Sequence, residues 1–207
     1  MPVVGFYATR GKRALDVAIC AMLLVLLLPL IAAVALAVLL TSGWPIFFGS
    51  ARVGRGGATF RMWKFRTMVR DAEAELARWE HTRPELAGEI ASSWKVARDP
   101  RVTALGRFLR RSSLDELPQF VNVLRGDMSL VGPRPYLPRE TLDAALAESI
   151  LAVRPGITGP FQVCGRNDLA PRSRMEIEAA YAPEITPLRD AAYLLRTVKP
   201  LLTLDGH

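Results

Sequence analysis

The sequence predicts a mostly helical α/β protein that combines a re-entrant membrane helix hairpin with a small cytoplasmic α/β part and surface amphipathic helices. Three observations predict this class. A long uncharged segment near the N-terminus contains a proline, basic residues flank both of its ends, and the remainder mixes β-prone with helical stretches. The 207 residues suit one compact domain with an appended segment. We expect residues 1–44 to form the membrane part and residues 45–207 the cytoplasmic part, with a helical insertion at 70–94.

The apolar segment at residues 17–40 contains no charge, and a run of this length normally forms a transmembrane helix. Pro29 divides it into halves of about 12 residues, each about 18 Å long, whereas the hydrocarbon core measures roughly 30 Å. Basic residues on both sides favour two cytoplasmic ends, which a helix that turns back at Pro29 provides. These flanking residues are Arg10, Lys12, Arg13, Arg52, Arg55, Arg61, Lys64 and Arg66.

Two other interpretations of this segment stay open at the level of the sequence. A straight span is compatible with Pro29, because membrane helices tolerate proline. A cleaved signal peptide is favoured by the small residues at 33–37, but its apolar region should be only about 7 to 15 residues long. The sequence alone therefore does not separate a re-entrant helix from a spanning one.

The remaining elements follow from glycine positions and helical periodicity. Residues 46–68 are β-prone and broken by Gly54, Gly56 and Gly57, which predicts a short hairpin or an extended ribbon. Residues 101–111 place apolar side chains on one face and arginines on the other, as in a basic amphipathic helix that covers a core or rests on a membrane. Further helices are expected at 139–153, 172–182 and 188–202.

The formal net charge of +7 indicates an anionic partner: nucleic acid, an anionic membrane surface or a phosphorylated substrate. Nucleic acid is not expected, because no recognition motif or spaced aromatic platform is present. Phosphate-binding glycine motifs of the common kinds are also missing. The chain has only two cysteines and two histidines. These are too few to favour a disulfide framework, a cysteine or histidine metal site, or a Ser-His triad. Chemistry must therefore use carboxylates, cations and backbone amides.

An adjacent acidic pair, Asp115 and Glu116, lies within RRSSLDELPQF at residues 110–120. One interpretation is a helix start, in which Ser113 and Glu116 form a capping box and acids in the first turn contribute about 0.3 to 1 kcal/mol each. Pro118 argues instead for an irregular bend, because it would interrupt the hydrogen bonding of a new helix. Two acids at a bend can converge on one cation.

Several cations occur in glycine- or proline-marked segments, where the chain can turn to bring them together. Arg134 is the most specific candidate for a phosphate ligand. Pro133 and Pro135 restrict the backbone on both sides of it, and a rigid arginine suits bidentate phosphate binding. Each of these cations taken alone is better explained as a solvated charge than as a ligand. The set comprises Lys64, Arg66, Arg110, Arg111, Arg134 and Arg166.

Long stretches of the chain resemble the bacterial sugar transferases, or monotopic phosphoglycosyl transferases. The resemblance rests on KRALD before the proline-broken run, WPIFF, ARVGRGGATFRMWKFRTM, DPRVTALGRFLRRSSLDELPQFVNVLRGDMSLVGPRP and RPGITGPFQVCGRN. It covers nearly the whole chain except about residues 70–94 and the extreme termini. The resemblance implies transfer of a sugar-1-phosphate from a UDP-sugar to undecaprenyl phosphate with release of UMP. It also implies a re-entrant helix beside a small α/β catalytic core.

The resemblance further implies roles for individual residues. Asp115 would be the nucleophile that forms an aspartyl phosphosugar, and Asp115 and Glu116 would hold Mg²⁺. Asp190 matches an acid of the family's last motif and would serve the substrate or the structure. Glu178 stands where the family usually has an aspartate. The expected phosphate-binding residues are Lys64, Arg66, Arg110, Arg134 and Arg166.

These implications define the expected partners and location. The partners are a UDP-sugar, undecaprenyl phosphate and lipids of the bacterial inner membrane, with the catalytic part on the cytoplasmic face and no nucleic acid. The product would enter exopolysaccharide, O-antigen or glycoconjugate synthesis. The sugar and the oligomeric state, including a homodimer, stay open. Two rival functions are a membrane-anchored anion-binding scaffold without catalysis and a nucleotide-sugar diphosphate hydrolase.

Overall fold

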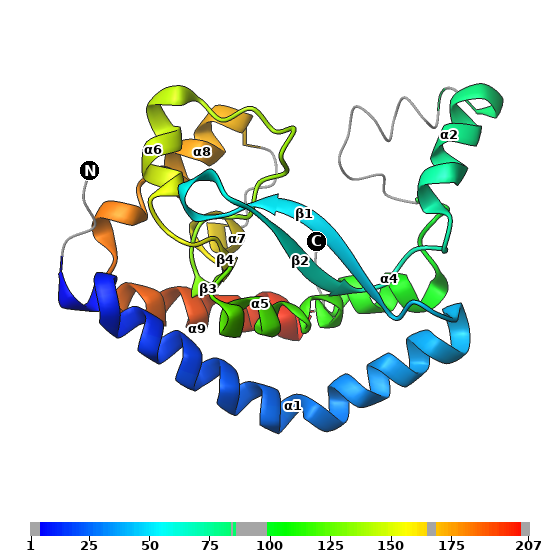
Figure 1. Ribbon diagram of the computed structural model, residues 1–207, viewed down its shortest axis with the longest axis horizontal. Helices are drawn as coiled ribbons and strands as arrows, with labels where there is room; N and C mark the ends of the chain where they lie inside the picture. The colour runs from blue at the N-terminus through cyan, green and yellow to red at the C-terminus, as the bar shows by residue number, and fades with distance from the viewer. Residues whose placement is uncertain (1–4, 84, 86–98, 165–168, 204–207) are drawn as a thin grey trace.

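The computed structural model describes residues 5–83, 85, 99–164 and 169–203 (Figure 1). Their fold is mostly helical with two small sheets, which confirms the mostly helical α/β part of the expected class. The elements are η1 Tyr7–Gly11, α1 Lys12–Ser42, β1 Phe47–Val53, η2 Arg55–Gly57, β2 Thr59–Phe65, α2 Ala72–Thr82, α4 Ala104–Arg111, η3 Leu114–Glu116, α5 Gln119–Arg125, β3 Ser129–Val131, α6 Ala144–Leu151, β4 Gly156–Thr158, α7 Pro160–Cys164, α8 Pro171–Ala179, η4 Ala182–Glu184 and α9 Pro187–Thr203.

The apolar segment forms one continuous helix, α1, with Pro29 inside it. Figure 1 shows that α1 bends near its middle and that both ends turn toward the rest of the protein. Proline explains the bend, because it removes one helical hydrogen bond and crowds the preceding turn. Residues Tyr7–Ser42 contain an 18-residue window with a mean hydropathy of 3.2, and the helix is long and apolar enough to cross a membrane by length and composition. The segment is thus a single bent helix, not two helices joined by a turn.

The two ends of α1 are held by separate parts of the core. Cys20 in the first half belongs to a cluster with Met62, Met128 and Leu130. Val34 and Val38 in the second half pack with Phe65 of β2 and Leu109 of α4. Between these anchor points, the apolar side chains of Val25, Leu26 and Leu28 are 61–76% exposed. The middle of α1 therefore presents apolar surface, while its ends belong to the folded body.

The predicted hairpin at residues 46–68 is confirmed as the antiparallel pair β1–β2. Gly56 and Gly57 in the turn have φ of 68° and 82°, where residues with a Cβ are strained. Phe48 lies opposite Lys64, and Arg52 lies opposite Phe60. Opposite residues share a face, as do alternate residues along a strand, so Lys64 and Arg52 are on the same face of the hairpin.

A second sheet, which the sequence analysis did not anticipate, pairs β3 and β4 in parallel. Each strand has three residues, too few to show an alternating pattern. Close backbone approach holds them: a Cβ added to Gly156 would come within 2.2 Å of the Gly132 nitrogen. A third small core is formed by Tyr136, Ile150 and Ala179, and it packs the loop after β3 against α6 and α8.

The predicted helices outside α1 are found with shifted bounds. The helix expected at 101–111 is α4, which begins after the N-cap Thr103, whose hydroxyl accepts from the Gly106 N–H at 2.9 Å. Those at 139–153, 172–182 and 188–202 correspond to α6, α8 and α9. The expected insertion at 70–94 contains α2, and residues 84 and 86–94 of it lie outside the described residues.

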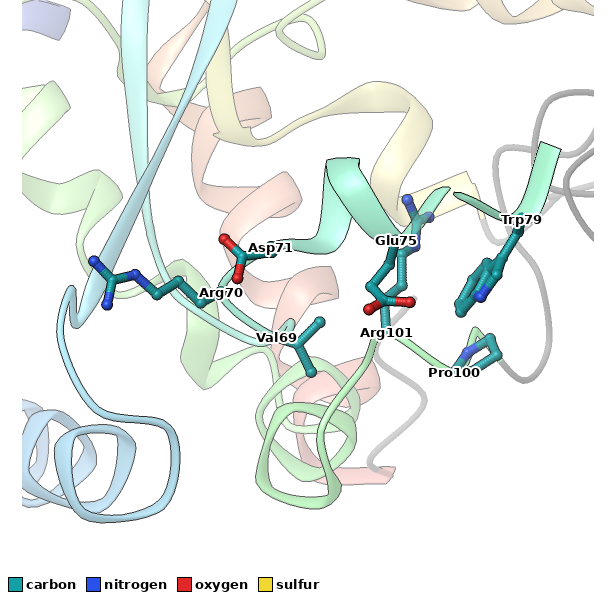
Figure 2. Close-up of a pocket in the computed structure, with 7 residues that line it drawn as sticks. All are labelled: Val69, Arg70, Asp71, Glu75, Trp79, Pro100 and Arg101. Carbon is teal, nitrogen blue, oxygen red and sulfur yellow. The ribbon is translucent and has the colours of Figure 1, made fainter. Parts of the chain in front are cut away.

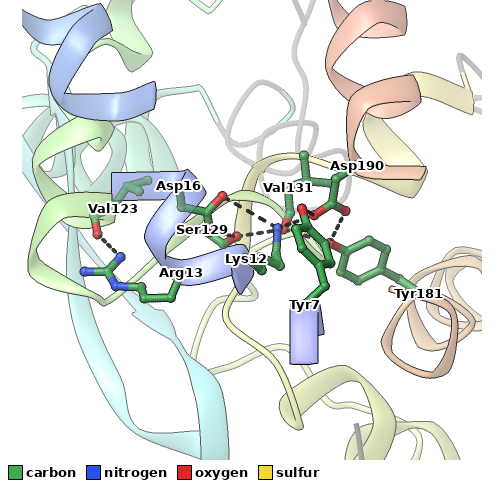
Figure 3. A network of polar contacts seen from close by, with 9 residues as sticks. All are labelled: Tyr7, Lys12, Arg13, Asp16, Val123, Ser129, Val131, Tyr181 and Asp190. Carbon is green, nitrogen blue, oxygen red and sulfur yellow. Dashed lines mark hydrogen bonds and ion pairs between the residues drawn. The ribbon is translucent and has the colours of Figure 1, made fainter. Parts of the chain in front are cut away.

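A buried polar network ties the start of α1 to α9 and β3 (Figure 3). The Lys12 Nζ lies 2.7 Å from Asp190 Oδ2 and 3.7 Å from Asp16 Oδ1. The hydroxyls of Tyr7 and Tyr181 donate to Asp190 at 2.8 and 2.6 Å. Among the two roles expected for Asp190, the substrate and the structural one, these contacts are those of a structural acid.

This network predicts a large loss of stability on replacing Asp190 with asparagine. Lys12 would keep its buried charge but lose its closest counter-charge, which costs about 3 kcal/mol for a buried pair. Thermal unfolding of the purified protein in detergent measures the effect. The neighbouring substitution Arg189→Ala breaks an exposed ion pair with Glu184 and should change the stability by less than about 0.5 kcal/mol. Equal effects of the two variants would contradict this account.

Candidate functional site

The acidic pair lies at a sharp bend between α4 and α5. After α4 ends at Arg111, Ser113 adopts φ 55°, in the left-handed region, and Leu114–Glu116 form a 3₁₀ turn. Pro118 then precedes the first residue of α5. The Ser113 side chain makes no capping hydrogen bond, so the capping-box interpretation is wrong. The bend that Pro118 suggested is confirmed.

Lys64 of β2 brings a positive charge to both acids. Its Nζ lies 2.6 Å from Glu116 Oε1 and 3.8 Å from Asp115 Oδ2. The Asp115 residue is 6% exposed, while the Glu116 and Lys64 side chains are 35% and 27% exposed. The group therefore sits at the edge of the core, with its acids open to an incoming ligand on the Glu116 side.

Burial and the neighbouring charges together set the pKa of Asp115. Burial raises the pKa of Asp115 to about 6, and Glu116 adds to this, whereas Lys64 and Arg110 oppose it. For Lys64, partial burial favours the neutral amine, but Glu116 and Asp115 outweigh it and raise its pKa. At neutral pH the site thus holds a mostly ionised buried carboxylate whose charge is balanced by neighbouring cations.

Arg110 approaches the pair from the last turn of α4. Its Nε donates to the Thr67 hydroxyl at 2.9 Å, and burial lowers its pKa while the charges of Asp115 and Asp99 oppose that effect. The structure therefore brings together Lys64, Arg110, Asp115 and Glu116. Arg110 follows Leu109, which packs on Val34 and Val38 of α1, so α4 is held against the second half of α1.

Arg134 is held in position by two glutamates. Its backbone N–H donates to Glu178 Oε2 at 3.1 Å, and its Nη2 lies 3.3 Å from Glu140 Oε1. Glu140 Oε2 also accepts from the Leu137 N–H at 2.6 Å. Glu178 is 1% exposed, and its Oε1 has no hydrogen-bond partner among the described residues. The loop that carries Arg134 is thus braced at both its backbone and its side chain.

Arg52 of β1 joins this region, although the sequence analysis counted it only as a flanking charge. Its Nη1 donates to the Pro135 carbonyl at 3.0 Å. Charges of Arg134, Glu140 and Glu116 all act on it, which places it between the loop of Arg134 and the acidic pair. The even spacing from residue 52 to residue 48, opposite Lys64, would have shown the shared face once the hairpin register was known.

Two of the expected phosphate-binding residues, Arg66 and Arg166, are not placed beside the acidic pair by the described contacts. The Arg66 Nη2 donates to the carbonyls of Ser42 and Gly43, the latter at 2.7 Å, and so caps the C-terminal end of α1. The contacts of the described residues do not place Arg66 with Lys64, and this corrects the expected grouping. Arg166 lies outside the described residues.

A hollow of about 230 Å³ lies beside α2 and the segment that follows β2 (Figure 2). Glu75 and Trp79 of α2 line it together with Pro100 and Arg101. Arg101 is already paired with Asp99 at 2.7 Å, and the carboxylates of Asp71 and Glu75 would repel a phosphate. This hollow is therefore poorly suited to bind a phosphate.

The donor set at the acidic pair fits Mg²⁺ bound together with a substrate. No cluster of three or more metal-binding Asp, Glu, His or Cys side chains occurs in the part of the chain that the structure describes. Mg²⁺ is commonly bound by one or two carboxylates plus substrate phosphates and water. Asp115 and Glu116 offer two such carboxylates, side by side at the 3₁₀ turn.

The comparisons with known proteins cover nearly the whole chain. The sequence pattern of the bacterial sugar transferase family matches residues 7–204. The chain is 39% identical over 197 residues to the exopolysaccharide production protein ExoY of Sinorhizobium fredii, with 95% of this chain and 87% of that protein covered.

Two further relatives carry names that state a reaction. The undecaprenyl-phosphate galactose phosphotransferase of Salmonella typhimurium is 40% identical over 197 residues, which cover 94% of this chain but only 41% of that relative. The UDP-glucose:undecaprenyl-phosphate glucose-1-phosphate transferase of Caulobacter vibrioides is 40% identical over 204 residues, with coverage of 94% and 71%. The chain thus spans a minor part of the Salmonella relative and most of the other two.

Glu178 predicts an unusual dependence of stability on pH. Burial raises its pKa from 4.5 to about 8 in the folded protein. Its contribution to stability is therefore fully present below the unfolded value and is lost as the pH rises through the folded value. Because glutamine cannot ionise, Glu178→Gln should gain stability relative to the unsubstituted protein as the pH rises from about 5 to about 8.5. Melting temperatures of both proteins across this range provide the measurement; a constant difference would contradict the prediction.

Proposed function

Because the chain belongs to the bacterial sugar transferase family and is a transferase, we propose that it moves a sugar-1-phosphate from a UDP-sugar to undecaprenyl phosphate. The observation that carries the proposal is the buried Asp115 beside Glu116 and Lys64, with the charge of Arg110 acting on it. The names of two relatives that mention undecaprenyl phosphate specify galactose in one case and UDP-glucose in the other. UDP-galactose and UDP-glucose are therefore the first donors to test.

The reaction would proceed in two displacements at one phosphorus atom. An ionised Asp115 oxygen attacks the β-phosphorus of the UDP-sugar, and the bond to the bridging oxygen breaks, so that UMP leaves with the bonding electrons. An oxygen of undecaprenyl phosphate then attacks the same phosphorus, and the aspartyl bond breaks to restore the carboxylate. Asp115 suits this role because its pKa of about 6 leaves it mostly ionised at neutral pH.

The cations would lower the repulsion between anionic substrates and an anionic nucleophile. Lys64 and Arg110 neutralise charge at Asp115 itself, while Arg134 lies on a loop braced by glutamates and can bind a further phosphate oxygen. When bound, Mg²⁺ would be held by Asp115 and Glu116 and would neutralise the diphosphate. Charge neutralisation and positioning are the main requirements of phosphoryl transfer.

We further propose that residues 1–44 enter the cytoplasmic leaflet of the bacterial inner membrane as a re-entrant helix, with residues 45–207 on the cytoplasmic face. Both halves of α1 pack on one folded body, so a straight span would have to pull one end away from its core contacts. The helices that run near α1 in Figure 1 also expose apolar side chains suited to a membrane surface. These include Phe108 of α4, Val121 of α5, and Leu188 and Leu195 of α9.

UMP release from a panel of UDP-sugars tests the reaction. With undecaprenyl phosphate and Mg²⁺ present, we expect steady release from at least one donor, and chelation of the metal should stop it. Asp115→Asn should lower the rate by at least about 1,000-fold, because it removes the nucleophile. Full activity of Asp115→Asn, or no metal-dependent UMP from any donor, would disprove the assignment.

Omission of the lipid acceptor separates the rival functions. A transferase should stop after about one UMP per protein, because the aspartyl intermediate has no acceptor. A nucleotide-sugar diphosphate hydrolase would continue, and a non-catalytic scaffold would release none. Mass measurement of the stalled protein should show an added phosphosugar.

The topology is tested by cysteine accessibility in a Cys164→Ser background. We expect cysteines introduced at the exposed positions Phe6 and Ala145 to react with a membrane-impermeant maleimide from the cytoplasmic side only. Labelling is compared between intact spheroplasts and inverted vesicles. Reaction of the two positions from opposite sides would refute the re-entrant helix.

A further inference from the structure

Arg52 is a half-buried cation with unused hydrogen-bonding capacity. Its Nη1 donates to the Pro135 carbonyl, but its Nε is buried without a hydrogen-bond partner. Arg52 forms no ion pair with any of the residues that the structure describes. A buried guanidinium that is not fully satisfied is costly unless an anion completes its bonding.

The surroundings of Arg52 indicate where such an anion would bind. The Val53 N–H donates to the Tyr136 carbonyl at 2.8 Å, which fastens the end of β1 to the loop of Arg134. Arg52 donates to the carbonyl of the residue that follows Arg134, so the two arginines lie close together; the charge of Arg134 repels that of Arg52, whereas Glu140 and Glu116 attract it. Arg52 also acts on Lys64 through its charge and shares a hairpin face with it. Two like charges held this close by the backbone would be relieved by an anion between them.

The position of this region in the fold distinguishes the two substrates. Arg110 lies on α4, which packs against the second half of α1, where a lipid acceptor would arrive. Arg52 and Arg134 instead adjoin the core formed by Tyr136, α6 and α8. Figure 1 shows α6 and α8 across the β1–β2 hairpin from α1. A water-soluble donor would therefore reach Arg52 and Arg134 from the side away from the membrane helix.

We propose that Arg52 is a further substrate-binding residue and that, with Arg134, it holds the diphosphate of the nucleotide donor. This inference rests on the proposed function, because it assigns one of the two substrates to a defined part of that site. Two adjacent guanidinium groups present several N–H donors in fixed planes, which suits the closely spaced oxygens of a diphosphate. Arg52 does not take part in bond making.

The test compares Arg52→Ala and Arg52→Lys with the unsubstituted full-length protein in nanodiscs. Calorimetry with UDP and Mg²⁺ measures binding without turnover, and steady-state assays give separate KM values for the UDP-sugar and undecaprenyl phosphate. For Arg52→Ala we expect the UDP Kd and the donor KM to rise about 10- to 100-fold, with the acceptor KM unchanged. Arg52→Lys should recover part of the affinity, because lysine keeps the charge but not the planar donors.

Arg61→Ala is the matched control, because Arg61 is on the same hairpin but on the opposite face, where it stacks on Trp63 at 5.4 Å. It should leave all three constants unchanged. The inference is overturned if Arg52→Ala binds UDP normally while its melting temperature falls, since Arg52 would then only brace the loop. A rise confined to the acceptor KM would overturn it as well. Should Arg52→Ala fail to fold, UDP binding by Arg52→Lys and Arg52→Gln decides between these outcomes.

The proposed function and this inference fail in different ways. If the unsubstituted protein releases no UMP from any UDP-sugar, both are overturned. If it is active and its UDP affinity does not depend on Arg52, only the assignment of Arg52 is lost.

Discussion

The ion pair between Lys12 and Asp190 is the interaction on which the arrangement of α1 depends. Both groups are buried, and Asp190 also accepts from Tyr7 and Tyr181, so each charge has several partners. Buried charges persist only where pairing and hydrogen bonding compensate their desolvation. The first turn of α1 is therefore fixed to α9 and β3, far away in sequence. At the other end, Arg66 binds the last carbonyls of α1.

Anchoring both ends of α1 also places the cations of the site. The strand that carries Lys64 continues into Arg66 at the end of α1, and α4 packs on α1 next to Arg110. Nearer the turn of the hairpin, Arg52 and Arg134 depend on the small core around Tyr136. Different parts of the core thus position two groups of cations, Lys64 with Arg110 and Arg52 with Arg134. In the free protein Glu116 and Glu140 partly neutralise them, and substrate phosphates would compete for the same cations.

The sequence was most informative where structure is local. Glycines in a β-prone run predicted the hairpin, and Pro118 predicted the bend that holds Asp115 and Glu116. The capping box failed because Ser113 adopts a left-handed conformation that turns its side chain away from the following N–H groups. The parallel pair β3–β4 was missed because three-residue strands carry no periodic pattern, and their pairing depends on glycines that permit close approach.

By itself, the sequence determined the apolar helix with its proline, the hairpin, the helical segments and the bend that carries the acidic pair, because each depends on neighbouring residues. Tertiary structure alone decided which cations serve that pair. It placed Arg66 at the C-terminal end of α1, paired Asp190 with Lys12, and brought Arg52 beside Arg134. An arginine on a turn looks alike in sequence whether it binds a carbonyl, a carboxylate or a phosphate. Its partner is set by strand register and helix packing, which join residues that are distant along the chain.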